Sequence, residues 1–443
     1  MQNSTTFNNR FILQVSFISA LGGYLFGFDF AVIAGALPFL KAQFGFNEYW
    51  DGFATASLAL GCMLGCLVAG RIADRYGRKP GLLQAAGIFF ISSIAMALSP
   101  DRFFFVSCRL IAGIGVGMAS TLSPLYIAEI APTESRGRMV AINQLTIVLG
   151  ILITNIVNYL LRNEGNDAWR WMVGLGAIPS ALFLAGVCWL PESPRWLINA
   201  GKTDKAAAIL IRIGGAHYAG NMIEKNTPDN SRRGYAGLFS KAVLPALLVG
   251  MVLAVFQQLC GINVVFNFAT TIFQSVGFNQ DDQLKQTIFI GIVNLLFTIL
   301  AMWQVDKLGR KPLMLLGAGG LAILYIASAF LLQQKSGFAA WTLLASIGVY
   351  AMSLAPVTWV LIAEIFPSKI RGVAVSVSVL ALWFAYAILV FTFPILASRL
   401  GTYTPFYLYA IICVLGFLFI YRNVKETNGR SLEDIGDVTI SAH

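Results

Sequence analysis

The heptapeptide Asp74-Arg75-Tyr76-Gly77-Arg78-Lys79-Pro80 recurs 232 residues later as Asp306-Lys307-Leu308-Gly309-Arg310-Lys311-Pro312. A second segment, Ile127-Ala128-Glu129-Ile130-Ala131-Pro132, recurs 235 residues later as Ile362-Ala363-Glu364-Ile365-Phe366-Pro367. A weaker echo of residues 191–195 follows at 426–430. Repeats at a nearly constant offset indicate a duplicated structural unit. The sequence therefore predicts two halves of the same architecture.

The composition of the chain is that of a membrane protein. Hydrophobic residues make up 57% of the 443 residues, charged residues make up 12%, and the mean hydropathy is +0.72. A soluble domain has about 45–50% apolar and about 25% charged residues. So few charges cannot cover the surface of a soluble globule. A disordered chain and a coiled coil are excluded by the same numbers.

Twelve apolar stretches are each long enough to cross a bilayer as a helix, which takes about 20 residues. Open strands are excluded because their unpaired backbone groups would have no water partner in lipid. The longest stretch could hold two helices, but a split there would invert every later loop. The stretches are 11–40, 52–70, 80–100, 103–128, 139–161, 171–191, 242–280, 286–305, 312–334, 336–363, 372–398 and 400–421.

The basic residues give these spans an orientation. With twelve spans, 23 of the 31 basic residues fall on the side that holds both termini, and seven fall on the other. The positive-inside rule makes the richer side cytoplasmic. The net charge of +10 then belongs to loops that flank the membrane, and a nucleic-acid partner is not needed to explain it.

We therefore expect an all-α membrane protein with twelve transmembrane helices in two pseudo-symmetric six-helix bundles. The expected N-terminal bundle covers 1–191, and a polar, basic segment at 192–241 is expected to be a cytoplasmic helical linker. The C-terminal bundle, with a short cytoplasmic tail, is expected over 242–443. Duplicated halves with a site between them at the membrane midplane are the plan of many secondary transporters.

Three motifs carry a resemblance to a known family. They are Gly70-Arg71-Ile72-Ala73-Asp74-Arg75-Tyr76-Gly77-Arg78-Lys79, Pro191-Glu192-Ser193-Pro194-Arg195-Trp196-Leu197 and Gln257-Gln258-Leu259-Cys260-Gly261-Ile262-Asn263. Over nearly its whole length the chain resembles the sugar porter family of the major facilitator superfamily. The first motif is shared across the superfamily, and the other two are much more specific to sugar porters. The likeness is strongest to bacterial proton–sugar symporters of the xylose and glucose type.

This resemblance implies a secondary active transporter that imports a monosaccharide with protons by alternating access. It also implies a bacterial inner-membrane location, a functional monomer and no cofactor. A facilitative uniporter is the alternative. An integral-membrane enzyme is disfavoured because the only two histidines, His217 and His443, lie outside the apolar stretches. The six cysteines show no metal-binding spacing, so we expect no metal site.

Asp29 and Arg109 are the two charges deep inside apolar stretches. A charge at the bilayer centre costs about 2.5–3.5 kcal/mol on insertion scales, so neither should face lipid, and their opposite signs suggest a pair. One interpretation is a pair that merely holds the first and fourth helices together. The other is proton coupling, since symporters of the family carry an Asp at the position of Asp29 and passive carriers tend to have Asn. Burial favours a protonated carboxyl and a nearby cation favours a charged one, so opening and closing a cavity could load and release a proton.

Amide side chains form a second group of candidates. An amide both donates and accepts hydrogen bonds, which suits a sugar hydroxyl, and an indole ring could pack on the C–H face of a pyranose. Bonding between helices is the alternative explanation for such amides. The resemblance places all six candidates at sugar-contacting positions. They are Gln144, Gln257, Gln258, Asn263, Asn294 and Trp359.

Two positions depart from the pattern of the family. Relatives usually carry Tyr-Tyr or a similar pair after the Asn of the seventh span, where this chain has Asn267-Phe268. Beside Trp383, relatives commonly have Gln or Asn, where this chain has Leu382. The sugar pocket is therefore expected to be more apolar on one side.

Charged residues at the expected cytoplasmic helix ends form the third group. In relatives such residues join across helix ends and hold the inner gate shut, whereas exposed pairs in general contribute only about 0–1 kcal/mol. An ordinary set of positive-inside loop charges is the alternative. The Glu-to-Arg interval of seven residues, which occurs in both halves, favours the gate. The candidates are Arg75, Arg78, Glu129, Arg136, Glu192, Arg195, Arg310, Glu364, Arg371 and Glu426.

Overall fold

The computed structural model describes residues 7–132, 135–225, 243–366 and 371–426. Twelve helical spans in these residues are long and apolar enough to cross a membrane, which confirms the predicted number. The helices extend past the apolar stretches because their charged ends can reach water. Asn47, for example, caps α2 by accepting a hydrogen bond from the backbone N–H of Trp50 at 3.0 Å. Side-chain oxygens at helix starts satisfy N–H groups that the helix itself leaves unpaired.

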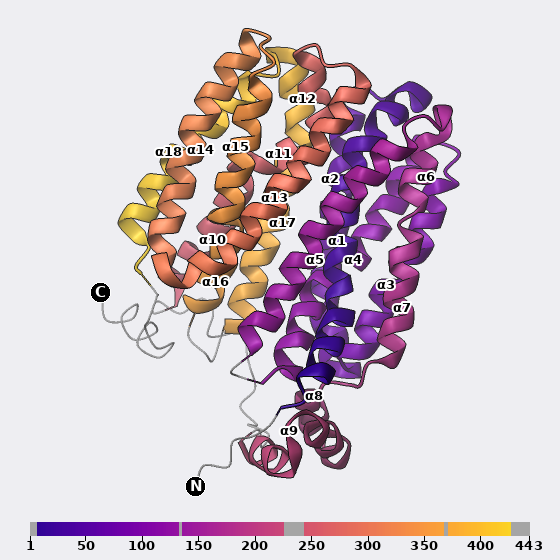
Figure 1. The fold of residues 1–443 in the computed structure, drawn as a ribbon, viewed down its shortest axis with the longest axis vertical. Helices are drawn as coiled ribbons and strands as arrows, with labels where there is room; N and C mark the ends of the chain where they lie inside the picture. Colours follow the sequence, from indigo (N-terminus) through magenta and orange to yellow (C-terminus); the bar gives the residue numbers. More distant parts are fainter. Residues whose placement is uncertain (1–6, 133–134, 226–242, 367–370, 427–443) are drawn as a thin grey trace.

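The first half of the chain forms one bundle, shown from indigo to magenta in Figure 1. Within it α2 packs against α4, and α1 packs against α5. A side chain at Gly113 or Gly117 of α4 would overlap the backbone of α2, so these glycines serve close helix packing. The bundle contains α1 (Asn9–Phe44), α2 (Glu48–Tyr76), α3 (Arg78–Ala97), α4 (Arg102–Ile130), α5 (Arg136–Leu161), α6 (Ala168–Gly174) and α7 (Ala177–Trp189), with a short 3-10 helix at Gly165–Asp167.

The second half forms a matching bundle, shown from rose to yellow in Figure 1. Two of its spans are interrupted. The seventh span is divided into α10, α11 and α12, and the tenth into α15 and α16 with a break at Ser353. The elements are α10 (Leu244–Leu259), α11 (Ile262–Asn267), α12 (Ala269–Ser275), α13 (Gln280–Leu308), α14 (Arg310–Gln333), α15 (Ala339–Met352), α16 (Leu354–Glu364), α17 (Arg371–Leu400) and α18 (Thr404–Asn423).

Two helices between the bundles lie at one end of the molecule, α8 (Pro194–Asn199) and α9 (Thr203–Lys225) (Figure 1). They belong to the segment predicted as a cytoplasmic linker. The start of α1 is attached to α9, since the backbone N–H of Asn8 donates to the carbonyl of Ile213 at 2.9 Å. The guanidinium of Arg212 also lies 4.1 Å from the ring centre of Phe11. The linker helices are therefore fastened to the first helix of the N-terminal bundle.

The two bundles are joined by polar contacts at the end opposite α8 and α9. The amide of Asn155 in α5 donates to the carbonyl of Thr287 in α13 at 2.7 Å. The hydroxyl of Thr270 in α12 donates to the carbonyl of Ala34 in α1 at 2.9 Å. Arg162, just after α5, forms an ion pair with Asp281 at the start of α13. These contacts close the bundle interface at this end.

The break between α10 and α11 depends on a glycine. Gly261 has φ +89°, which is the left-handed region, and a side chain there would also overlap the ring of Tyr409. A left-handed conformation costs other residues roughly 1–2 kcal/mol. The last turn of α10 and the whole of α11 take their relative direction from this one residue.

We predict that Gly261→Ala lowers the free energy of unfolding by at least about 1–2 kcal/mol, because alanine must adopt the left-handed conformation and also displace Tyr409. Thermal unfolding of the purified protein in detergent measures the change. Gly87→Ala in α3 is the matched control, because a methyl group there meets nothing within 4 Å, and alanine in a helix should be neutral or stabilising. Equal melting temperatures for the two variants would contradict the role of Gly261.

Candidate functional site

An ion pair buried in the N-terminal bundle forms the centre of the candidate site. Nη1 of Arg109 in α4 lies 3.1 Å from Oδ1 of Asp29 in α1, and Nη2 donates to the backbone carbonyl of Asp29 at 3.3 Å. Both side chains are fully buried. The structure thus brings together the two charges that the sequence singled out, and it holds α1 against α4 at this level.

The second carboxylate oxygen of Asp29 lies outside the hydrogen bonds of this pair. Among the described residues, neither Oδ2 of Asp29 nor Nε of Arg109 has a hydrogen-bond partner. A buried polar atom without a partner is costly and calls for an explanation. A carboxylate oxygen without a donor can accept a proton, and protonation would leave the charge of Arg109 without its partner. Chemically, the pair can therefore exist in two states, charged and paired, or protonated and released.

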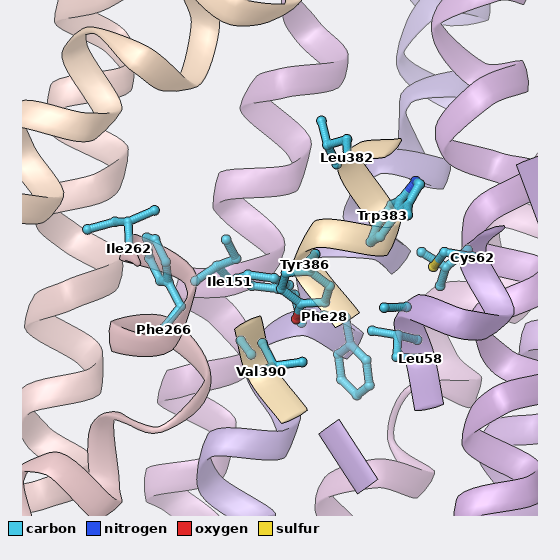
Figure 2. Close-up of a cluster of buried hydrophobic side chains, with 14 of the residues drawn as sticks. Phe28, Leu58, Cys62, Ile151, Ile262, Phe266, Leu382, Trp383, Tyr386 and Val390 are labelled. Carbon is cyan, nitrogen blue, oxygen red and sulfur yellow. The ribbon is translucent and has the colours of Figure 1, made fainter. Parts of the chain in front are cut away.

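Apolar and aromatic residues from both bundles surround this level of the protein. Figure 2 shows Phe28 of α1, Leu58 and Cys62 of α2, and Ile151 of α5 beside residues of α11 and α17. The ring of Phe26 in α1 meets the edge of Trp383 in α17, with centroids 5.6 Å apart. Leu382 is buried in the same cluster. The interface is thus apolar at Leu382, one of the two positions that depart from the expected family pattern.

The amides of the seventh span form a chain of hydrogen bonds. Nε2 of Gln258 donates to Oε1 of Gln257 at 3.0 Å, and Nδ2 of Asn263 donates to Oε1 of Gln258. All three are buried, at the junction of α10 and α11. The break at Gly261 brings them together, since Gln258 and Asn263 are five residues apart and would not face each other on a continuous helix. We call Gln257, Gln258 and Asn263 the seventh-span amides.

The other predicted sugar contacts lie on separate helices. Gln144 is half-buried in α5, and Asn294 is buried in α13. Trp359 in α16 has 40% of its surface exposed, so its ring is free to meet a ligand or lipid. The sugar-binding roles of these residues stay predictions.

Two residues with a clear place in this arrangement were not among the predicted site residues. The side chain of Asn267, the last residue of α11, accepts a hydrogen bond from the hydroxyl of Tyr386 in α17 at 3.2 Å. The sequence marked Asn267 only as a departure from the family pattern, and it gave no reason to single out Tyr386. An Asn and a Tyr in apolar spans each need a hydrogen-bond partner, which is a sequence signal for both. Spacing could not show that they bind each other, because 119 residues separate the two.

At the end near α8, charged residues form a cluster within the N-terminal bundle. Arg78 binds Glu129 through two hydrogen bonds, from Nε at 2.9 Å and from Nη2 at 3.0 Å. The hydroxyl of Ser193 donates to the same carboxylate at 2.5 Å. A two-pronged contact between arginine and carboxylate is both stronger and more specific in geometry than a single bond. The structure thus brings Arg78 and Glu129 together in one half.

Glu192 and Glu426 have the same local role in the two halves. The carboxylate of Glu192 accepts from the backbone N–H groups of Arg78 at 2.9 Å and Lys79 at 3.2 Å, at the start of α3. The carboxylate of Glu426 accepts from those of Arg310 at 2.9 Å and Lys311 at 3.0 Å, at the start of α14. Negative charge at a helix N-terminus is favourable. The weak sequence echo therefore marks a duplicated helix cap.

Three further predicted gate residues of the N-terminal half point toward solvent instead of into this cluster. Arg75, Arg136 and Arg195 are exposed. The side chains of Glu364 and Arg371 lie outside the described residues. The contacts of Glu129 and Glu192 described above lie within one bundle, so a role of these charges in holding the two bundles together stays a prediction.

The chain matches known proteins over nearly its whole length. Residues 15–438 match the family model described as sugar (and other) transporter. The chain is 37% identical to the D-xylose-proton symporter of Escherichia coli strain K12, over 98% of this chain and 96% of the relative. It is 36% identical to the arabinose-proton symporter of Bacillus subtilis strain 168, over 96% and 94% of the two chains.

A solved structure has the same fold. The partially occluded inward-open conformation of a xylose transporter from Escherichia coli superposes with a TM-score of 0.86, at 35% identity, over 95% of this chain and all of the other. The chain belongs to the sugar transporter family, and it is a multi-pass membrane protein of the major facilitator fold.

We predict that Gln258→Ala and Asn263→Ala each weaken sugar binding. Loss of one partner from a buried hydrogen bond costs about 1–3 kcal/mol, which is about five- to 150-fold in affinity. Equilibrium binding of labelled sugar to the purified protein measures the change. Gln333→Ala, at the exposed end of α14, is the control and should bind normally. Normal binding in both amide variants would remove these residues from the site.

On the interpretation that the cytoplasmic charges hold the inner gate shut, we also predict that Glu129→Gln slows transport and shifts the resting population toward the inward-open state. The amide cannot neutralise Arg78, whose side chain is only 10% exposed, and an unpaired buried charge is unfavourable. Initial uptake rates, together with labelling of Cys66 by an impermeant thiol reagent on the cytoplasmic side, measure both effects. Glu164→Gln, in an exposed loop at the other end, should change neither. Unchanged rate and labelling in Glu129→Gln would argue against a role of these charges in the inner gate.

Proposed function

We propose that this protein imports a monosaccharide together with protons by alternating access. The observation that carries the proposal is the fully buried pair of Asp29 and Arg109 with one carboxylate oxygen left without a donor, in a chain of the sugar transporter family. The named relatives at 37% and 36% identity are proton symporters for D-xylose and arabinose. The substrates are accordingly a pentose or hexose and protons, with the lipid bilayer as the surrounding partner and a monomer as the functional unit.

The proposed organisation follows the repeat. Residues 1–191 act as the N-terminal bundle, 192–241 as a cytoplasmic linker, and 242–443 as the C-terminal bundle with its tail. Both termini face the cytoplasm, in agreement with the distribution of basic residues. The relatives named above come from bacteria, which supports the bacterial inner membrane as the location. In this orientation the polar contacts of Asn155 and Thr270 close the outer side.

In the proposed cycle the proton and the sugar use different halves. With the outer side open, Asp29 takes a proton from the acidic side and releases Arg109. The two bundles can then close around sugar that is held by the seventh-span amides. After the inner side opens, the sugar leaves, the proton follows, and the ion pair of Asp29 and Arg109 forms again. The structure has this pair formed and the end opposite α8 closed, which fits a carrier that has released its proton inside.

The membrane potential gives the proton its driving force. One charge crossing 100 mV supplies about 2.3 kcal/mol, and about 1.4 kcal/mol corresponds to a factor of ten. One proton per sugar therefore supports roughly 50-fold accumulation. The alternative is a facilitative uniporter in which Asp29 and Arg109 only hold α1 to α4, and it predicts no accumulation at all.

We predict that Asp29→Asn abolishes uphill sugar accumulation but retains sugar binding. Asparagine resembles the protonated carboxyl in volume and charge, so the variant stays in the released state. Uptake of labelled D-xylose, L-arabinose and D-glucose into reconstituted vesicles, with internal pH recorded at the same time, measures accumulation and proton flux together. Arg109→Ala should also uncouple the two fluxes, because the charged form of Asp29 loses its partner.

Asp167→Asn is the matched control, because Asp167 is exposed at the end of the short 3-10 helix, where it pairs with Arg170, and it should behave like the wild type. Wild-type uptake without acidification of the lumen would contradict symport. So would continued accumulation by Asp29→Asn, and in both cases the uniporter becomes the correct description.

A further inference from the structure

The amide of Asn267 connects the seventh-span amides to α17. Its Nδ2 donates to the backbone carbonyl of Asn263 at 2.6 Å, and its Oδ1 accepts from the hydroxyl of Tyr386 at 3.2 Å. Asn267 is fully buried and Tyr386 is 1% exposed. Both hydrogen bonds are therefore made away from water, where the loss of one partner leaves the other unsatisfied. A displacement of α11 must accordingly move Tyr386 or break this bond.

The ring of Tyr386 connects α17 to the helix that carries Asp29. It stacks on the ring of Phe30 in α1, with centroids 5.7 Å apart and an interplanar angle of 28°. Phe30 directly follows Asp29 in the sequence. The other side of the contact comes from α11, because Phe266 lies 5.8 Å from Phe30 between centroids. Figure 2 shows Tyr386 and Phe266 entering the interface from α17 and α11.

Phe30 is thus held between Tyr386, the hydrogen-bond partner of Asn267, and Phe266, the residue that precedes Asn267. Asn267 is the neighbour of Phe266 in α11 and the hydrogen-bond partner of Tyr386 in α17. Close-packed side chains transmit displacement because the interior has little free volume. The contact is also the place where the C-terminal bundle, with its amides, meets the N-terminal bundle next to its ion pair.

We propose that Asn267 and Tyr386 are positioning residues that couple sugar binding at the seventh-span amides to proton binding at Asp29. The proposal rests on the symport proposed above. When sugar binds the amides, α11 shifts, and the hydrogen bond from Tyr386 to Asn267 carries the shift to α17. The stacked ring of Tyr386 then moves Phe30, and with it the backbone of Asp29 relative to Arg109 on α4. In the reverse direction, protonation frees α1 and lets α11 close on the sugar.

The groups that face Asp29 are few, so the effect of this contact can be separated from theirs. They are Arg109 from α4, the thiol of Cys62 from α2 and the phenol of Tyr386 from α17. The sequences of α11 and α12 contain no Asp, Glu, Lys, Arg or His. The seventh span therefore acts on Asp29 through packing and hydrogen bonds, since it carries no charge that could act directly.

Coupling between two ligands is reciprocal, so it can be measured from either side. In the wild type, lowering the pH should raise sugar affinity by a factor in the range typical of coupled sites, about five- to 150-fold. In Tyr386→Phe, which keeps the stacked ring and removes the hydroxyl, this factor should fall toward one. Asn267→Leu, which keeps the approximate volume and removes the acceptor, should have the same effect. The number of protons carried per sugar should fall in both variants while downhill sugar uptake continues.

The experiment uses the full chain in vesicles and the labelled sugar that the wild type accumulates best. Sugar affinity is measured from about pH 5.5 to about pH 8, and proton flux is recorded during uptake. Tyr325→Phe is the matched control. Its phenol is also fully buried in the C-terminal bundle, and among the described residues its oxygen has no hydrogen-bond partner. Tyr325→Phe removes a tyrosine hydroxyl but leaves the hydrogen bond between Tyr386 and Asn267 in place, so this variant should keep the wild-type pH profile and proton ratio.

The double variant Tyr386→Phe/Asn267→Leu distinguishes a shared bond from two separate effects. If the bond carries the coupling, the double variant should be no less coupled than either single variant, because the bond is lost only once. A wild-type pH profile and proton ratio in Tyr386→Phe, with coupling lost in Asp29→Asn, would overturn this proposal and leave symport standing. Loss of coupling in Tyr325→Phe as well would also overturn it. If the wild type itself carries no protons, both proposals fall.

Discussion

Asp29 and Arg109 are buried away from water, so each depends on the other to balance its charge. The arrangement of the N-terminal bundle follows from that constraint. Each side chain is fully buried, and breaking a buried pair by removing one member is far more costly than the net stabilisation the pair provides. α1 must therefore lie against α4 at this level whenever the pair is charged. Because Phe30 and Phe26 sit on the same helix, the pair also sets how α1 presents its aromatic rings to α17 and α11. In the proposed cycle, protonation of Asp29 removes the attraction that holds α1 to α4, and this is how a structural contact would act as a switch.

The duplicated halves differ in the continuity of corresponding spans and in the polar residues that these spans carry. The first and fourth spans are continuous helices, α1 and α4, and they hold the charges. Their counterparts in the second half, the seventh and tenth spans, are broken at Gly261 and Ser353, and the seventh holds the amides. Irregular backbone at membrane depth is tolerated where protein or a cavity surrounds it, and the residues from Gly261 to Thr270 are all buried. A regular helix suits an ion pair that, in the proposed cycle, separates and re-forms at a fixed height. A broken one lets five-residue neighbours such as Gln258 and Asn263 meet, which a continuous helix would prevent.

The sequence was informative where a property is local and failed where it depends on a distant partner. The twelve spans follow from stretches of apolar residues, and the tight packing of Gly113 and Gly117 follows from their place inside a span. The pair of Asp29 and Arg109 was accessible because two opposite charges in apolar helices must find each other. The seven-residue interval from Glu129 to Arg136 does not identify partners, since Glu129 binds Arg78 from another helix while Arg136 is exposed, and the gate that this interval favoured stays a prediction. The bond of Asn267 with Tyr386 could not be foreseen, because 119 residues separate the two and their proximity is created by the break before α11.

The two glutamate caps show how each half is closed on itself at the end near α8. Glu192 follows the sixth span and Glu426 follows the twelfth, yet each accepts hydrogen bonds from the first residues of α3 or α14. Gly77 and Gly309 lie directly before these helices with positive φ, and a side chain at either would meet the carboxylate. One acidic residue therefore stabilises a helix start and ties the last span of its half to the third. The cross-bundle contacts of Asn155, Thr270 and Arg162 lie at the other end. Two bodies that are each tied internally at one end, and tied to each other at the opposite end, can separate by rocking about the joined end without losing their internal contacts.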